Sequence, residues 1–110
     1  MKLAIISDIH ANLEALERAF EIIDSKNIKT VICLGDIVDY GANPNECIEL
    51  VRKYCKTTLL GNHDEVMDDL TLAYKNFGQF ALSSSIWTTN TLIQENRKFL
   101  LSLPFVHKEE

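Results

Sequence analysis

Three short clusters hold the side chains in this sequence that are best suited to chemistry. They are Ser7-Asp8-Ile9-His10, Gly35-Asp36 with Asp39 close behind, and Gly61-Asn62-His63-Asp64. Each cluster follows directly on a short apolar run that is typical of a buried strand, at residues 3–6, 31–34 and 57–60. Parallel strands bring their carboxyl ends to one edge of a sheet, where open α/β folds bind their ligands. The sequence therefore predicts that the three clusters meet in one site.

The residue types in these clusters are typical of a metal centre. Asp8 and His10 are two positions apart, and extended backbone would point a carboxylate oxygen and an imidazole nitrogen at one cation. Asp36 has two oxygens and is our candidate to bridge two cations, while Asn62 would give an amide oxygen to the second. Nitrogen and oxygen ligands without thiolate favour divalent ions, manganese first, with iron, zinc, nickel or cobalt as alternatives.

Two cations roughly 3.5–4 Å apart can clamp phosphoryl oxygens and promote in-line attack at phosphorus. His63 would then lie near the leaving-group oxygen as a general acid or electrostatic stabiliser, and Asp64 could orient its imidazole. Asp39 is predicted to support His10 or its own loop. These roles together predict the hydrolysis of a phosphodiester or a phosphomonoester.

In chain order, three motifs resemble the first three signatures of the calcineurin-like metallophosphoesterases: Asp8-Ile9-His10, Gly35-Asp36, and Gly61-Asn62-His63-Asp64. Longer stretches, at residues 7–13, 35–41 and 81–104, are similar to a bacterial and archaeal branch of small phosphodiesterases and diadenosine-tetraphosphatase-like enzymes. The resemblance implies that His63 and Asp64 are the catalytic pair. It also implies the metal ligands Asp8, His10, Asp36 and Asn62. The family's later signatures, a further histidine and a closing Gly-His-x-His, are absent from this sequence.

The resemblance implies an α/β fold, namely the N-terminal half of a four-layer αββα metallophosphoesterase sandwich. We expect one incomplete domain over residues 1–110, with a βαβαβ metal-site half at 1–64 and a helical segment at 65–110. Such a half-sheet would leave an exposed edge and an uncovered apolar face. Without the later histidines we expect weak, partial metal occupancy, mostly at the first site. Activity would then need the missing half or a second copy of the chain.

The composition is that of an ordinary globular protein, with 46% hydrophobic and 25% charged residues among 110. A net charge of −5 argues against a nucleic-acid-binding face, which needs basic residues. It allows a phosphorylated small molecule or a nucleotide as substrate, because bound cations reverse the local field. The three cysteines form no Cys-x-x-Cys pair, and no apolar run suits a signal peptide or a membrane span. We therefore expect a reduced, cytoplasmic protein without a membrane partner.

Two helices are expected between the three strands. The first follows Asn12, a good N-cap, and has apolar residues on one face over positions 13–23. The second follows Asn43, with Pro44 at its first position and Glu46 at the spacing of a capping box. These helices would be the crossovers that make the strands parallel.

Residues 68–103 contain no convincing strand and are predicted to form two or three helices, broken at Gly78. A capping-box spacing at Thr91 is expected to open the last of them. The aromatic residues of this segment are Tyr74, Phe77, Phe80 and Trp87. We expect them to fill the helical core, with stacking on a nucleobase as the alternative.

Two other function classes compete with the hydrolase. The same fold could serve as a non-catalytic scaffold for protein interaction, although a scaffold has no need of His63. A flavodoxin-like or Rossmann-type nucleotide-binding domain is disfavoured, because no Gly-x-Gly-x-x-Gly follows the first strand.

Overall fold

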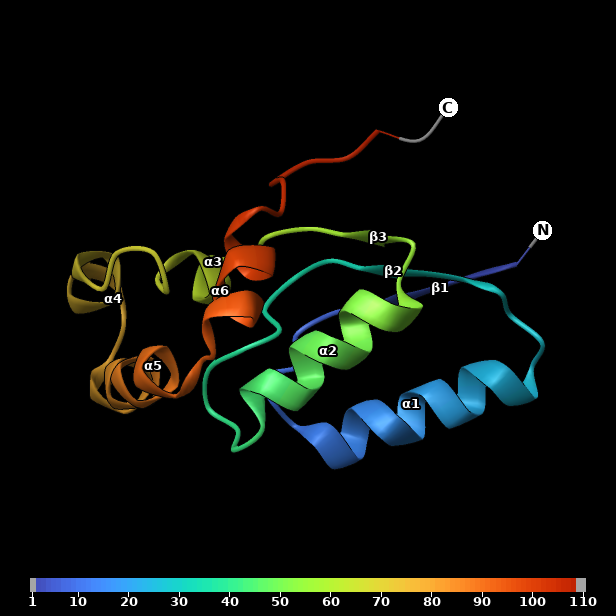
Figure 1. Ribbon diagram of the computed structural model, residues 1–110, viewed down its shortest axis with the longest axis horizontal. Helices are drawn as coiled ribbons and strands as arrows, with labels where there is room; N and C mark the ends of the chain where they lie inside the picture. The colour runs from blue at the N-terminus through green and yellow to red at the C-terminus, as the bar shows by residue number, and fades with distance from the viewer. Residues whose placement is uncertain (1, 109–110) are drawn as a thin grey trace.

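The computed structural model describes residues 2–108, and its centre is a parallel sheet of three strands (Figure 1). The strands β1 (Leu3–Ile6), β2 (Thr30–Cys33) and β3 (Thr57–Thr58) lie in the order β1-β2-β3. β1 pairs with β2 along its whole length, whereas β3 pairs only at Ile32 and Cys33 of β2. β3 is shorter than the expected strand at 57–60, although the N–H of Leu59 still donates to the carbonyl of Cys33 at 2.9 Å, and that of Leu60 donates to the carbonyl of Pro104.

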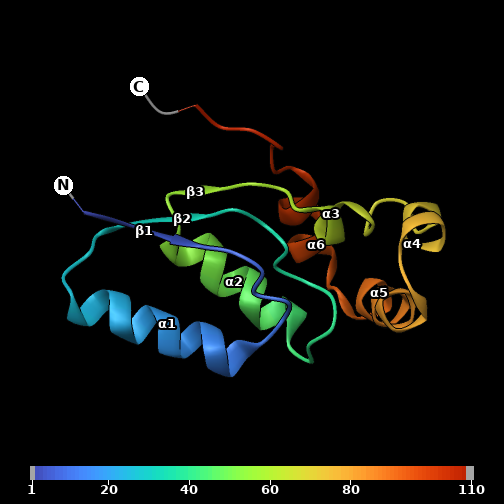
Figure 2. The ribbon, with the colours of Figure 1, turned by 180° about the vertical axis from the view of Figure 1, so that it is seen from behind.

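The crossover helices α1 (Leu13–Ser25) and α2 (Pro44–Tyr54) both pack on one face of the sheet (Figures 1 and 2). Asn12 caps α1 as expected, since its Oδ1 accepts a hydrogen bond of 3.1 Å from the N–H of Ala15. Asn43 precedes α2, but its side chain donates to Glu46 rather than accepting from the helix backbone. The α/β class and the parallel strands with helical crossovers are confirmed.

No helix formed by residues 2–108 covers the opposite face of the sheet, as Figures 1 and 2 show. Leu3 and Ile5 of β1 alternate with half-buried residues and are 43% and 59% exposed. Leu34, which follows β2 on the same face, is 45% exposed. The expected uncovered apolar face is therefore present in the described part of the chain.

Between Asn62 and Leu101 the chain forms helices that lie beyond the carboxyl ends of the strands (Figure 1). These are α3 (Asn62–Glu65), α4 (Thr71–Asn76), α5 (Gln79–Thr91) and α6 (Gln94–Leu101). Gly78 precedes α5, so the expected break is confirmed. The capping box expected at Thr91 is wrong: Thr91 is the last residue of α5 and its hydroxyl donates to the carbonyl of Trp87. The short helix α3 was not expected.

The prediction that four aromatic residues fill the helical core is wrong for three of them. Phe80 is 91% exposed, Tyr74 63% and Trp87 48%, whereas Phe77 packs against the core. For Phe80 and Trp87 the reason is that the fully buried residues of α5 are the small and polar Ala81, Ser85 and Thr88, whereas these two aromatic side chains face solvent.

The core itself lies between the sheet and α2 and continues under the helical segment. Its fully buried members include Cys33, Ile37, Ile48, Val51 and Leu100. Burial raises the pKa of the Cys33 thiol to about 11 and those of the other two cysteines, Cys47 and Cys55, to about 12, so these thiols are protonated packing groups. Among the described helices, none combines the length and the apolar character that crossing a bilayer requires.

Candidate metal and catalytic site

The loops that follow β1 and β2 are joined directly by backbone hydrogen bonds. The N–H of Asp8 donates to the carbonyl of Gly35 at 3.1 Å, and that of His10 to the carbonyl of Asp36 at 3.0 Å. Ala11 continues the series with a bond of 2.7 Å to the carbonyl of Ile37. Hydrogen bonds between the two loops thus continue beyond the ends of the strands, and they set the distance between the first two clusters.

Two glycines allow the third cluster to approach the second. Gly35 has a φ of +107°, and a Cβ built on it would lie 2.5 Å from the backbone nitrogen of Gly61. A Cβ on Gly61 would in turn collide with the backbone nitrogen and the carboxylate of Asp36. Any larger residue at either position would therefore push the loops after β2 and β3 apart.

The conformation of these loops differs from the extended backbone that we expected. Asp8 and His10 have φ angles of 55° and 47°, and Asp36 has 54°, all in the left-handed region. Asp39 and Tyr40 also have positive φ, at 75° and 67°. Left-handed residues other than glycine each cost about 1–3 kcal/mol and cluster at functional sites. The Asp8 and His10 side chains still converge, but tight turns bring them together rather than strand alternation.

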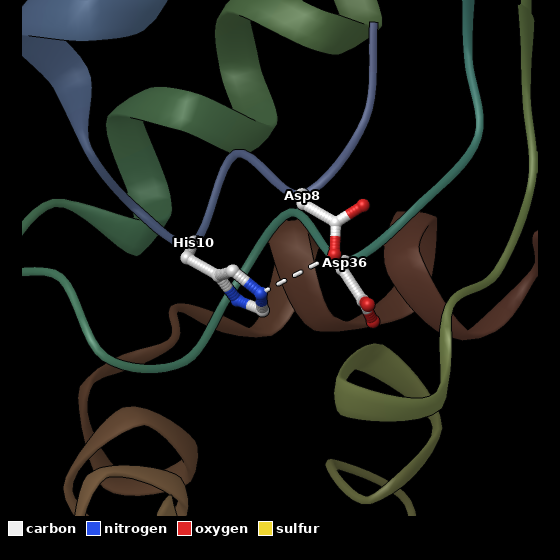
Figure 3. A group of neighbouring side chains, drawn as sticks. All are labelled: Asp8, His10 and Asp36. Carbon is white, nitrogen blue, oxygen red and sulfur yellow. Dashed lines mark ion pairs between the residues drawn. The ribbon is translucent and has the colours of Figure 1, made fainter.

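Asp8, His10 and Asp36 form a compact group of potential metal donors (Figure 3). One ligand atom of each lies within 4.8 Å of the others, and His10 Nε2 is 3.7 Å from Asp8 Oδ1. His10 Nδ1 donates to the carbonyl of Val38 at 2.9 Å, because a carbonyl can only accept. This bond fixes the tautomer and leaves the Nε2 lone pair directed at the two carboxylates.

Two residues of the third cluster lie against the same carboxylate. The backbone N–H of His63 donates to Asp36 Oδ1 at 2.9 Å. One end of the Asn62 amide is 3.3 Å from both Asp36 oxygens. If the amide nitrogen occupies that position, it donates to the carboxylate. If the amide oxygen occupies it, three acceptor oxygens face one another, an arrangement that a cation would stabilise.

The imidazole of His63 is held by Asp39, not by Asp64. The distance between His63 Nδ1 and Asp39 Oδ2 is 2.8 Å, and the Asp39 side chain is completely buried. The ring also stacks on Phe77, with centroids 4.3 Å apart, and meets the edge of the His10 ring at 4.9 Å. The contact that we expected from Asp64 is therefore made by Asp39. The expected support of His10 by Asp39 is likewise wrong, because the carbonyl of Val38 provides it.

Asp64 has a different part in the structure, as the common acceptor for two loops. Its Oδ1 accepts hydrogen bonds from the N–H groups of Ile37 and Val38, and its Oδ2 from those of Asp36 and Gly61, at 2.8–3.2 Å. Burial raises the pKa of Asp64 to about 6. At neutral pH the carboxylate is therefore ionised and can accept all four bonds.

Two neighbours of the site, Tyr40 and Ser85, were not among the expected site residues. Tyr40 is 55% exposed and its ring lies 4.9 Å from that of His10 and 5.3 Å from that of His63. Ser85 of α5 donates to Asp39 Oδ2 at 2.6 Å from a fully buried position. A groove beside the site is lined by residues 8–12 and 40–43 together with Glu14. No local sequence pattern marks Ser85 as a site residue, because it is 46 positions away from its partner Asp39.

Comparisons with known proteins find relatives that match nearly the whole chain. An uncharacterized protein from Methanocaldococcus jannaschii is 46% identical over 108 residues, a match that covers 97% of this chain and 44% of the relative. A crystal structure of a metallophosphoesterase from Sphaerobacter thermophilus superposes with a TM-score of 0.77 at 42% identity. The match includes 94% of this chain and 42% of the Sphaerobacter chain. The chain therefore spans less than half the length of these relatives.

A second solved structure, of a candidate diadenosine tetraphosphatase, shares the fold with a TM-score of 0.60 at 24% identity. That match includes 93% of this chain and 42% of the other chain. The family model of the calcineurin-like phosphoesterases matches residues 1–109, nearly the whole sequence. The chain belongs to the calcineurin-like phosphoesterase family.

Proposed function

We propose that this chain carries the metal-binding part of a metal-dependent phosphoesterase that hydrolyses phosphodiesters or phosphomonoesters. The observation that supports this most directly is the group of Asp8, His10 and Asp36, in which the free Nε2 of His10 faces two carboxylates. Two carboxylates within 4.8 Å of each other repel, and a divalent cation removes that repulsion. The donor set therefore fits a cation, with Mn²⁺ as the first choice.

In this proposal Asp8, His10 and Asp36 hold the first ion, and Asp36 and Asn62 hold the second. Bound divalent ions would supply charge to the phosphoryl oxygens and activate a water for attack. Among the described residues this proposal gives the second ion two ligands and the first ion three, so we expect the second to bind more weakly. The exposure of Asn62 and of Asp8 leaves this side of the site open to a substrate.

His63 is assigned to the leaving group. Asp39 accepts a hydrogen bond from Nδ1, so the other ring nitrogen is free to act toward a substrate oxygen. Phe77 holds the ring by stacking on its face. Asp64 takes no direct part in this step, because its carboxylate is occupied by four backbone N–H groups.

The uncovered face of the sheet supports a second element of the proposal. Leu3, Ile5 and Leu34 expose an apolar surface opposite α1 and α2, and exposed apolar patches are typical of contact surfaces. The relatives are more than twice as long as the matched region. We infer that full activity requires further chain, or a second copy, on this face.

The test combines metal binding with hydrolysis. Mn²⁺ should raise the midpoint of thermal unfolding of the purified chain, and Asp36→Asn should abolish this shift while the exposed-site control Asp68→Asn retains it. Hydrolysis of a chromogenic phosphodiester and phosphomonoester should then be compared between the chain alone and the chain fused to the unmatched part of the Methanocaldococcus relative. A Mn²⁺ response that survives Asp36→Asn would refute the proposed centre.

The non-catalytic scaffold remains the second candidate, and the uncovered apolar face is the observation that favours it. The two functions differ in their dependence on His63. If the longer protein hydrolyses neither substrate with any of the five candidate metals, or if His63→Ala hydrolyses both at the wild-type rate, the scaffold becomes the better explanation.

A further inference from the structure

Helix α5 reaches the site from the helical segment through two adjacent serines. The Ser85 hydroxyl donates to Asp39 Oδ2 at 2.6 Å, and the Ser84 hydroxyl oxygen accepts the backbone N–H of Tyr40 at 3.1 Å. The Ser84 hydroxyl also donates to the carbonyl of Ala81 in its own helix, so its oxygen is fixed relative to α5. One turn of α5 therefore binds two consecutive residues of the loop after β2.

These two residues have a backbone conformation that needs such support. Asp39 and Tyr40 both have positive φ, and neither is a glycine. Two left-handed residues in succession are costly, and they persist only when surrounding contacts fix them. The carbonyl of Asp39 accepts the N–H of Gly41 at 2.9 Å across this turn, but that bond is local. The contacts to Ser84 and Ser85 attach the turn to a helix.

The Asp39 carboxylate depends on the serine for its orientation. Oδ2 carries both of its hydrogen bonds, one with His63 Nδ1 at 2.8 Å and one with Ser85 at 2.6 Å. Oδ1 is buried and has no hydrogen-bond partner among the described residues. Without the serine, the imidazole would be the one remaining hydrogen-bond partner of this carboxylate among the described residues, and the carboxylate would be freer to rotate about the bond to Cβ.

We propose that Ser84 and Ser85 are positioning residues for His63. They fix the left-handed turn at Asp39 and Tyr40, and through Asp39 they set the direction of the His63 imidazole. The helical segment would thereby determine the geometry of a site whose polar donors come from the strand-end loops. This inference rests on the proposed role of His63, but its test requires no substrate and no metal.

The test is nuclear magnetic resonance of the His63 ring in the 110-residue chain at one fixed neutral pH. In the wild type we expect the Nδ1–H tautomer and a slowly exchanging ring proton. Ser85→Ala should speed exchange of that proton about tenfold, which corresponds to the loss of one hydrogen bond to a charged group. Ser83→Ala is the matched control, because Ser83 lies in the same helix and is exposed. It should leave the ring signals unchanged.

A second variant covers the case in which Ser85→Ala does not fold. Ser85→Cys has nearly the same size and keeps a weak donor, so its exchange rate should fall between those of the wild type and the alanine variant. His63 ring signals in a folded Ser85→Ala or Ser85→Cys protein that equal those of the wild type would overturn the proposal. A change of the same size in Ser83→Ala would also overturn it. Failure of the phosphoesterase assay would affect neither result.

Discussion

The loops at the strand ends and the helical segment contribute to the site in different ways. The loops supply its polar donors, in particular Asp8, His10 and Asp36, and the residue types there already indicate metal chemistry. The helical segment supplies small hydroxyl groups and one stacking ring, which have no chemical signature of their own. Yet Ser85 donates to Asp39, which pairs with His63, and Phe77 stacks on the His63 ring itself. The comparison shows that donors and their geometry can come from separate parts of one chain.

The first test of this division of roles removes one metal donor from the strand-end loops. Asp36→Asn should abolish Mn²⁺ binding, because the amide cannot supply the charge that the cation needs. Its remaining oxygen can still accept the backbone N–H of His63, so the fold should persist. Manganese titration followed by electron paramagnetic resonance gives the measurement. Retention of wild-type affinity would show that the donors lie elsewhere.

A smaller effect is expected from His63, where the two regions meet. His63→Ala should lower the hydrolysis rate of an active longer protein by about 10²–10⁴-fold for a substrate with a poor leaving group, as expected for loss of a general acid. Metal affinity should not change, since His63 is not one of the proposed ligands. His107→Ala, in the C-terminal segment, is the control and should hydrolyse at the wild-type rate. Loss of metal binding in His63→Ala would contradict the separation of roles.

The Asp64 carboxylate joins the loops after β2 and β3 by hydrogen bonds. Their contribution can be measured as a change in the free energy of unfolding. Asp64→Asn should lower the free energy of unfolding by about 3 kcal/mol, because an amide cannot accept four hydrogen bonds and leaves buried N–H groups unpaired. Urea unfolding provides the value. The exposed Asp68→Asn should change it by less than about 0.5 kcal/mol. Equal values for both would mean that the four bonds do not stabilise the loops.

The smallest changes in the free energy of unfolding are expected for aromatic residues of the helical segment. They should differ between a packed ring and an exposed one. Phe80→Ala should change the free energy of unfolding by less than about 0.5 kcal/mol, because the ring is 91% exposed. Phe77→Ala should cost about 2–3 kcal/mol, since the ring packs on the core and on His63. Thermal unfolding of the two variants side by side distinguishes them. The reverse order would show that the segment packs in another way.

Much of the fold follows from local patterns in the sequence. The strand at Leu3–Ile6 has the expected bounds, and Asn12 caps α1 as its type and position indicate. The helices from Asp68 onward were expected, but their orientation was not. The bulky residues of α5 suggested a buried face, whereas the buried face consists of Ala81, Ser85 and Thr88. Which face of a helix is buried depends on the element it meets, and periodicity fails when the buried residues are small and polar.

The sequence alone determined the types of the donors and their place at the ends of parallel strands. That was sufficient to expect Asp8, His10, Asp36, Asn62 and His63 in one place, because chain direction and strand pairing fix where such residues lie. Only the tertiary structure decided that Asp39 rather than Asp64 pairs with His63, and that Ser85 supports Asp39. The physical reason is that these contacts join residues 24 and 46 positions apart through left-handed turns. No local propensity encodes such contacts. Packing of the loops after β2 and β3 against each other brings His63 to Asp39, and packing of α5 against the loop after β2 brings Ser85 to it.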